Sequence, residues 1–464
     1  MLRSLAGRAP RNWVALMAEQ QFTRRTSYGP SSPVIGSRGA RTRQQIVDTA
    51  LRCFTEDGFH GTSMDDIAHA AETSRATLYQ YFESKEAIFI ELMQSAGTAL
   101  SRVTRRLGPL GPTAEGFDNL HWWLGEWSWV FDRYSAMFIE WANVNSPKAP
   151  LRPLLARFVE GHAERFGRTL IASGYTGDET AVMSTLVLAL TNRFNYIRHV
   201  YRPGISDARL LLSLAIGLQL TLFPDTPVSV LEAGPASIER AEAETTDITP
   251  IPRMGPLATL PEDDEPLEQP SIAPLSPQAA NTVRQLLAAG AKVFADNGYD
   301  ATNVDQIVTE AGLARGTFYR YFDDKLDLMI ALARECAAEM SGPIRDLARF
   351  GAHPDPAGLR QWLREFSVLH RRYSGVLRAW TEGFPIEPAV LAPCRETVTA
   401  MSIAIIGLFG PMRSYPFDRR AGGMLLAGLL EHFPNEGKGS EHEPTPEQLV
   451  EAQALFIERV LLAR

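Results

Sequence analysis

The second half of this 464-residue chain repeats the first. At a constant offset of 240 positions the halves share identical residues, which in the first half are Phe54, Gly58, Thr62, Asp65, Ile67, Ala71, Arg75, Thr77, Tyr79, Tyr81, Phe82 and Lys85. The likeness resumes at an offset of 239, where Tyr134 corresponds to Tyr373 and Trp141 to Trp380. Chance does not keep register over this distance, and the chain is too long for one ordinary core. We therefore predict two copies of one folding unit.

The segment between the two copies, residues 224–277, has a composition unsuited to a core. It contains 11 of the 31 prolines, and its residues 262–268 are rich in acids. Each proline removes a backbone donor and disfavours helix at the preceding residue. We predict an extended, mostly disordered linker. A flexible chain of roughly 50 residues has an end-to-end distance of about 40 Å, which lets the two halves pack side by side.

Composition and motifs exclude several classes of protein. The cysteines, Cys53, Cys336 and Cys394, are odd in number and far apart, which fits neither a disulfide framework nor a zinc site. This usage indicates a reduced, intracellular protein. No apolar run reaches the roughly 18 uncharged residues that a membrane span needs. Because the sequence also lacks a phosphate-binding glycine loop, a metal-ligand cluster and a nucleophile elbow, we expect no enzyme, no cofactor, no metal and no membrane partner.

Helical periodicity runs through both copies, so we predict an all-α fold. In the first copy Gly58 is expected to end a long helix. Thr62 is expected to be the N-cap of a short helix over residues 64–71. After a tight turn, a second short helix follows over residues 74–81. Two short helices joined by a tight turn and packed on a longer one form a helix-turn-helix.

Two runs of sequence carry a family resemblance. The first copy reads FTEDGFHGTSMDDIAHAAETSRATLYQYFESKEAIF, and the second reads FADNGYDATNVDQIVTEAGLARGTFYRYFDDKLDLM. Both resemble the TetR family of bacterial transcriptional regulators. The resemblance implies two TetR-like units, each a three-helix helix-turn-helix domain followed by a helical ligand-binding and dimerisation domain. It also implies a cytoplasmic, ligand-responsive repressor that binds double-stranded DNA.

On this resemblance the chain divides into six segments. We predict a basic disordered arm (1–38), a first helix-turn-helix domain (39–86) and its helical domain (87–223), the linker (224–277), a second helix-turn-helix domain (278–326) and its helical domain (327–464). The net charge of −8 hides the excess of arginine in the arm. Whether the arm tracks DNA or is merely a disordered tail stays open.

The resemblance places DNA contacts on the second short helix of each copy. Arginine can form bidentate bonds to guanine, and threonine can contact the thymine methyl group. Tyrosine and lysine suit phosphate contacts, as do Thr62 and Thr302 in the family. The predicted contacts are Thr62, Ser74, Arg75, Ala76, Thr77, Tyr79, Tyr81 and Lys85 in the first copy, and Thr302, Arg315, Gly316, Thr317, Tyr319, Tyr321 and Lys325 in the second. One departure is Glu72, where the family and the second copy have glycine. It predicts a slightly strained turn and weaker binding by the first copy.

Aromatic residues gather after the first helix-turn-helix and, more thinly, after the second. Six of those in the first copy recur at helical spacing, so core packing is one interpretation. A pocket for a bulky apolar effector is the other. The candidate ligand-binding residues are Trp122, Trp123, Trp127, Tyr134, Phe138, Trp141 and Asn195 in the first copy, and Trp362, Phe366, Tyr373 and Trp380 in the second.

The sequence thus predicts a DNA-binding regulator, a repressor released from its operator by a small hydrophobic effector. Two arrangements stay open: the halves pair within one chain as a pseudo-dimer, or two chains form a dimer with four reading elements. A pseudo-dimer with unlike copies predicts an asymmetric operator. The alternative is a small-molecule-sensing or scaffolding protein in which one or both DNA-binding elements are vestigial.

Overall fold

The computed structural model describes residues 37–144, 152–175, 179–201, 205–234, 276–299, 301–381, 388–409, 417–433 and 444–462. Within these ranges the regular structure is helical and contains no strand, which confirms the predicted all-α fold. Nearly all of the predicted arm and most of the predicted linker lie outside the described residues.

Each half contains a similar series of helices. The first half has α2 (Ser37–Gly61), α3 (Met64–Ala70), α4 (Arg75–Tyr81), α5 (Lys85–Arg105), α6 (Ala114–Arg133), α7 (Ser135–Val144), α8 (Arg152–Ala172), α9 (Thr180–Tyr201), α10 (Asp207–Leu222) and α11 (Val228–Ala233). The second half has α12 (Pro277–Asn297), α13 (Val304–Ala311), α14 (Arg315–Phe318), α15 (Lys325–Leu347), α16 (Arg349–Ala352), α17 (Pro356–Arg372), α18 (Ser374–Thr381), α19 (Pro388–Leu408), α20 (Arg419–His432), α21 (Pro446–Phe456) and a π-helical turn, η3 (Ile457–Leu461).

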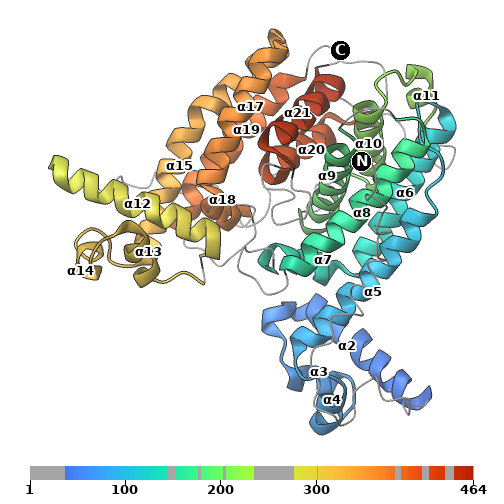
Figure 1. The fold of residues 1–464 in the computed structure, drawn as a ribbon, viewed down its shortest axis with the longest axis horizontal. Helices are drawn as coiled ribbons and strands as arrows, with labels where there is room; N and C mark the ends of the chain where they lie inside the picture. The colour runs from blue at the N-terminus through green and yellow to red at the C-terminus, as the bar shows by residue number, and fades with distance from the viewer. Residues whose placement is uncertain are drawn as a thin grey trace, which may run out of the picture.

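Two small three-helix lobes project from a larger helical body (Figure 1). Head 1 comprises α2, α3 and α4, and head 2 comprises α12, α13 and α14; the remaining described helices form the body. Figure 1 shows head 1 in blue at the bottom and head 2 in yellow at the left. In both heads the first short helix packs against the long one and the second short helix packs against the first. This is the packing that the helix-turn-helix pattern predicts.

The sequence explains where the short helices begin, with one correction. The expected N-cap Thr62 is wrong, because α3 begins at Met64 and the extended residue before it is Ser63. The Ser63 hydroxyl accepts from the Asp66 amide, and the Asp66 side chain accepts from the Ser63 amide. Asn303 and Gln306 form the same capping box on α13. Such a reciprocal pair satisfies two amides that a helix start leaves without partners.

Glycines turn the chain at the end of each long head helix. Gly58 has φ 74° and Gly298 has φ 80°, a region that side chains with a Cβ rarely adopt. Gly298 ends α12. At Gly58 the helix breaks as expected, but helical backbone resumes after it as far as Gly61.

The two halves pack against each other through four helices of the body. Helices α9 and α10 of the first half contact α20 and α21 of the second (Figure 1). Arg193 on α9 pairs with Glu431 on α20 at 2.5 Å and is almost fully buried. Helix α20 also lies close to α9, because a Cβ added to Gly428 would lie 2.9 Å from Cγ of Arg193.

A second polar contact joins the halves at the start of α20. Asp418, the N-cap of α20, pairs with Arg209 of α10 at 3.0 Å, and its amide donates to the Ser213 hydroxyl at 3.1 Å. Asp418 is buried, so both of its partners on α10 compensate the loss of water. The halves are therefore joined by specific polar contacts as well as by apolar packing.

The two heads are joined to the body differently. The buried side chains of head 2, including Phe294 and Phe318, belong to one continuous apolar core that runs through both halves of the body. Head 1 has its own apolar core, which reaches only to α5 and α7. Close packing explains the continuity in head 2. A Cβ added to Gly375 of α18 would lie 2.6 Å from the backbone carbon of Phe294.

One helix of the body, over residues Ala389–Leu408 of α19, is long and apolar enough to cross a membrane by length and composition. It contains the charged pair Arg395 and Glu396. It packs along α15 and also contacts α16 and α20. A core helix of a soluble domain meets the same criteria, and these contacts fit that interpretation.

The separate cores predict that head 1 unfolds locally and that head 2 does not. Leu78→Ala removes a fully buried side chain from head 1, at a cost of about 2–5 kcal/mol. We expect faster amide hydrogen exchange in α2, α3 and α4, with the protection of α9 and α20 unchanged. The matched variant is Phe318→Ala, at the corresponding position of head 2, which should also accelerate exchange in α15 and α17. Equal loss of protection throughout the body in Leu78→Ala would contradict the separation.

Candidate nucleic-acid interface

Most of the predicted contact residues lie on or beside the second short helix of each head. Leu78 in α4 and Phe318 in α14 are fully buried and fix each helix to its head. The neighbouring Arg75 and Arg315 are exposed, as are Ser74, Ala76, Tyr79, Gly316 and Tyr319. The threonines and second tyrosines, Thr77, Thr317, Tyr81 and Tyr321, are partly buried. In head 1 these residues lie on α4 and its N-cap, whereas in head 2 the two tyrosines follow the last residue of α14.

The second short helices of the two heads, α4 and α14, are called the reading helices below. They differ in length and in how they begin. Helix α4 has seven residues, and the Ser74 hydroxyl accepts from the Thr77 amide at 3.0 Å. Helix α14 has four residues, and its N-cap is Ala314, which has no side-chain cap. Gly316 further weakens α14, because glycine is a poor helix former. Head 2 therefore holds its reading residues on a less regular scaffold.

In the turns before these helices, it is head 1 that has the less favourable backbone. Gly312 adopts the left-handed conformation at φ 66°, which costs glycine nothing. Glu72 occupies the corresponding position in head 1 at φ 51°, where it is the only non-glycine residue with positive φ among the described residues. The side chain of Glu72 is exposed, so no packing compensates this conformation.

The strained turn predicts that Glu72→Gly stabilises head 1. A left-handed conformation costs a residue with a Cβ about 1–2 kcal/mol, and glycine loses part of this gain through its flexibility when unfolded. We expect the free energy of unfolding of head 1 to rise by about 0.5–1 kcal/mol. Exchange of the α3 and α4 amides measures it. Gly312→Ala should lower the stability of head 2 by a similar amount. A destabilised Glu72→Gly protein would mean that the glutamate side chain stabilises the turn.

Arg75 and Arg315 each lie beside an aspartate and a tyrosine of their own head. Arg75 Nε lies 3.1 Å from Asp65 Oδ1, and Arg315 Nη1 lies 3.1 Å from Asp305 Oδ2. Each guanidinium also lies 5.8 Å from a tyrosine ring centroid, Tyr79 in head 1 and Tyr319 in head 2. In head 2, Arg315 Nη2 donates to the Tyr319 hydroxyl at 3.3 Å, and this bond, with the charge of Asp305, raises the pKa of Arg315.

The residues expected to grip phosphates point inward instead. The Thr62 hydroxyl is buried and donates to the Gly58 carbonyl at 2.8 Å, and Thr302 donates to Gly298 at 2.7 Å. These hydroxyls close the turn after the long head helix. A side chain used in this way holds the head together, and its hydroxyl does not face solvent.

The two lysines complete the same turn. Lys85 Nζ donates to the carbonyls of Phe59 and Thr62 at 2.8 and 3.0 Å. Lys325 Nζ donates to those of Tyr299 and Thr302 at 2.9 and 3.0 Å. Each ammonium also lies over the aromatic ring at position 59 or 299, at 4.6 and 4.4 Å from the centroid. This geometry favours a structural role. The signal that sequence reasoning missed is the aromatic residue after the turn glycine, which recurs with the lysine in both copies.

The buried contacts of Lys325 predict that Lys325→Ala destabilises head 2 in the absence of DNA. Two partly buried carbonyls lose their donor, at a cost of about 1–3 kcal/mol. Exchange of the α13 amides measures this change. Arg320→Ala is the control, because it removes an exposed charge from the same head. If Lys325→Ala leaves the head stable and only flattens the salt dependence of DNA binding, the lysine contacts phosphate as the resemblance implies.

The aromatic candidates for ligand binding lie in two separate groups, one in each half of the body. Trp123 and Trp127 are fully buried, with ring centroids 5.1 Å apart, and Phe138 stacks on Phe131 at 4.8 Å. Trp122 and Tyr134 are only partly buried, and the side chain of Trp141 lies outside the described residues. This group forms the inner faces of α6 and α7.

The second group is smaller, and its polar atoms bond to the protein itself. Trp362 and Phe366 stack at 4.9 Å. The indole nitrogens of Trp362 and Trp380 donate to backbone carbonyls, and the Tyr373 hydroxyl donates to Glu335 and Glu339 of α15. In the first half, the Asn195 amide likewise donates to the Thr191 carbonyl. These contacts fit the core-packing interpretation, which leaves the ligand contacts a prediction.

A buried polar chain in the first half was not anticipated from the sequence. His162 of α8 lies between the rings of Trp127 and Phe158 and donates from Nδ1 to the Phe158 carbonyl at 2.9 Å. Its Nε2 lies 3.4 Å from the Ser101 hydroxyl, which also accepts from Arg165. Burial lowers the pKa of His162 to about 4, so the ring is neutral near pH 7. A lone histidine among apolar residues gives no sequence signal for such a chain.

Comparison with known proteins follows the division into two heads. A family model described as "Bacterial regulatory proteins, tetR family" matches residues 46–92 and again residues 286–332. The biofilm operon icaADBC HTH-type negative transcriptional regulator IcaR of Staphylococcus aureus (strain Newman) is 29% identical over 104 residues, which are 22% of this chain and 54% of that protein. The HTH-type transcriptional activator FasR of Mycolicibacterium smegmatis is 26% identical over 151 residues, 32% of this chain and 66% of that protein.

Solved structures show a weaker overall likeness. A putative TetR-family transcriptional regulator from Syntrophomonas wolfei is 20% identical and covers 39% of this chain and 94% of its own, with a TM-score of 0.34. The match to the first curated relative spans about half of that protein's length.

Proposed function

We propose that this chain is a sequence-specific DNA-binding transcriptional regulator in which one chain supplies both DNA-binding heads, because a TetR-family model matches one segment in each half. The observation that carries the proposal is the duplicated exposed face. Both heads carry an arginine, a threonine and two tyrosines on or directly after their second short helix, with the arginine paired to an aspartate in both. Such side chains suit base edges and phosphates in a major groove.

The contact between the halves supports an intrachain pseudo-dimer. Arg193 is buried and needs its acid partner, Glu431. At the offset of 239 that aligns Trp141 with Trp380, Glu431 corresponds to Asn192. If two first halves paired in the same way, Arg193 would face an amide. Pairing of unlike halves therefore satisfies a buried charge that pairing of like halves leaves without its acid.

Unlike heads favour an asymmetric operator. Helix α4 of head 1 has the sequence Arg-Ala-Thr-Leu-Tyr-Gln-Tyr from Arg75, whereas α14 of head 2 and the three residues after it have the sequence Arg-Gly-Thr-Phe-Tyr-Arg-Tyr from Arg315. On DNA we expect the heads to sit in successive major grooves about 34–36 Å apart. A small hydrophobic effector binding in the aromatic interior of α6 and α7 would change this separation and release the DNA, provided that it binds the two states unequally.

We propose that the protein is cytoplasmic and that it represses transcription of the genes whose operator it binds. Of the two relatives described above, one is named a negative regulator and the other an activator. A second candidate function is a small-molecule sensor with a vestigial head. The uncapped four-residue α14 makes head 2 the head to which that alternative applies.

The proposal predicts that the intact chain selects a composite site from random DNA. We expect two unlike half-sites bound by one chain, with the mass of the complex measured in solution alongside the selected sequences. A palindrome bound by two chains would contradict the pseudo-dimer. No enrichment at moderate salt would contradict the regulator itself and leave the sensing or scaffolding function.

A charge exchange at the contact between the halves provides the control. Glu431→Arg places a second cation beside the buried Arg193, so the variant should lose the composite site. The double variant Arg193→Glu with Glu431→Arg restores an opposite-charge pair and should recover it. If the double variant again binds the composite site, the single variant lost binding because its halves no longer paired, and both heads are intact.

A further inference from the structure

We propose that Asp65 and Asp305 are positioning residues that orient the base-reading arginines, Arg75 and Arg315. This inference rests on the proposed function, because it concerns how each head reads DNA. Neither aspartate belongs to a reading helix. Each lies on the first turn of the preceding helix, α3 or α13, and reaches across the turn to the arginine that begins the reading helix.

Corresponding residues pair in the two copies, through Nε of Arg75 in head 1 and through Nη1 of Arg315 in head 2. The distance is 3.1 Å in both heads, and in both the arginine also lies over the tyrosine four residues later. The reading helices differ at three of the positions between and beside these residues, where Ala76, Leu78 and Gln80 are replaced in head 2. The aspartate, arginine and tyrosine are identical. Both copies share this triad, together with the threonine and the second tyrosine, Thr77 and Tyr81 in head 1.

The ion pairs themselves add little stability, although an acid in the first turn of a helix favours the helix start. All four charged side chains of the two pairs are more than half exposed, and exposed pairs contribute little to folding. An aspartate on a face that approaches phosphates also weakens DNA binding through like-charge repulsion. We therefore assign these aspartates an effect on the orientation of the paired arginine.

The geometry gives that action a physical basis. A guanidinium is a planar fork that can make two parallel bonds to guanine O6 and N7. In head 1, Asp65 lies beside Nε, which leaves the edge formed by the two terminal nitrogens for the base. In head 2, Arg315 donates from Nη1 to Asp305 and from Nη2 to the Tyr319 hydroxyl, so the same two partners hold the plane of the guanidinium through its terminal nitrogens. The tyrosine ring lies across the guanidinium and limits its rotation. An arginine that is oriented before binding loses less side-chain entropy when it meets the base.

The anchor of the aspartate is itself rigid. The capping boxes of Ser63 with Asp66 and of Asn303 with Gln306 fix the first turns of α3 and α13. Asp65 and Asp305 are the second residues of those helices. The carboxylates therefore extend from the best-held part of each short helix.

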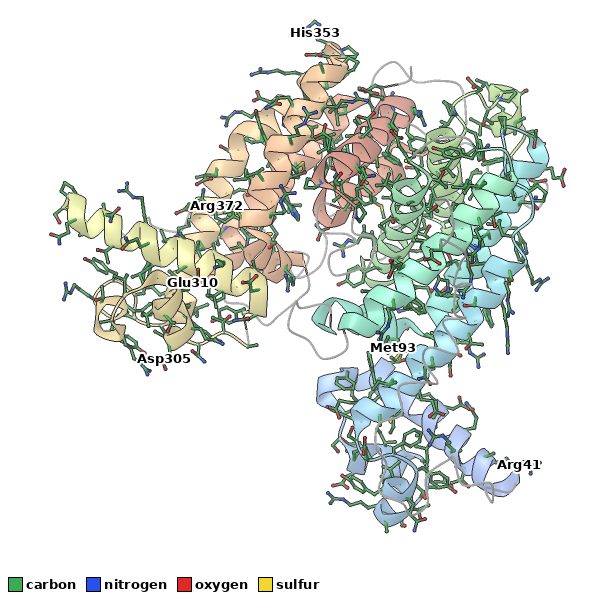
Figure 2. All side chains as sticks on the ribbon, viewed as in Figure 1. Arg41, Met93, Asp305, Glu310, His353 and Arg372 are labelled. Atoms are coloured by element: carbon green, nitrogen blue, oxygen red, sulfur yellow. The ribbon has the colours of Figure 1, made fainter. Side chains whose placement is uncertain are left out.

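Head 2 offers a matched pair of variants for the test. Asp305→Asn removes the charge that faces Arg315 and keeps the side chain's size. Glu310→Gln makes the same change of charge on the same helix, but Glu310 pairs with Lys292 of α12 at 2.5 Å. Figure 2 shows Asp305 at the outer edge of head 2 and Glu310 near α12. Both variants are made in the full chain, and melting without DNA checks that each folds.

Binding to the selected composite site and to its single-base variants is then measured for each protein. We expect Asp305→Asn to lower the discrimination at one base pair of the head 2 half-site by about tenfold, within the range that one bidentate contact provides. Both variants should bind random-sequence DNA more tightly than the parent, because each removes a negative charge. Only Asp305→Asn should lose discrimination.

A double-mutant cycle separates positioning from an independent contribution. Arg315→Ala should lose discrimination at the same base pair, and adding Asp305→Asn to it should cause no further loss. If Arg315→Ala loses discrimination and Asp305→Asn behaves like Glu310→Gln, the positioning role is overturned while the proposed function stands. If Arg315→Ala leaves discrimination unchanged, both the base-reading role of Arg315 and this inference fail.

Discussion

The packing of α9 and α10 against α20 and α21 is the constraint on which the rest of the molecule depends. It joins the halves through apolar contacts, the buried pair of Arg193 with Glu431 and the contacts of Asp418 with α10. Each head is mounted on its own half, so this contact sets the position of one head relative to the other. Buried polar contacts constrain the relative position of the two halves, because a buried charge that shifts loses its partner and does not become hydrated again. They therefore favour one arrangement of the halves over many of similar apolar area.

The duplication and the helical periodicity made the fold predictable, while the DNA contacts of the second short helices stay a prediction. The hydrogen-bond partners of individual side chains were harder to predict. Thr62, Lys85 and their counterparts look like phosphate contacts in sequence, yet each finds carbonyls within a turn that only the folded head brings into reach. Glu72 was predictable as a strained position because its counterpart is glycine, and it has the expected positive φ. Backbone conformation is local and leaves a trace in the residue type, whereas a hydrogen bond across 23 residues does not.

The aromatic residues also show what sequence can and cannot predict. Helical spacing predicts which rings face inward, and Trp123, Trp127 and Trp362 are buried accordingly. The spacing does not tell whether the interior is filled by the rings or leaves room for a ligand. Nor did it reveal the polar chain through His162, because its members come from two helices far apart in sequence. Contacts between distant segments decide both questions.

Covalent linkage of the two halves changes how the protein responds to its own abundance. Separate subunits must meet before they bind an operator, so their activity falls steeply when few copies are present. In one chain the partner half is held at an effective concentration on the order of millimolar, whatever the number of molecules in the cell. If the halves form the pseudo-dimer proposed above, operator occupancy follows the copy number in simple proportion. Few molecules then suffice to occupy an operator, and mixed pairing with related proteins is avoided.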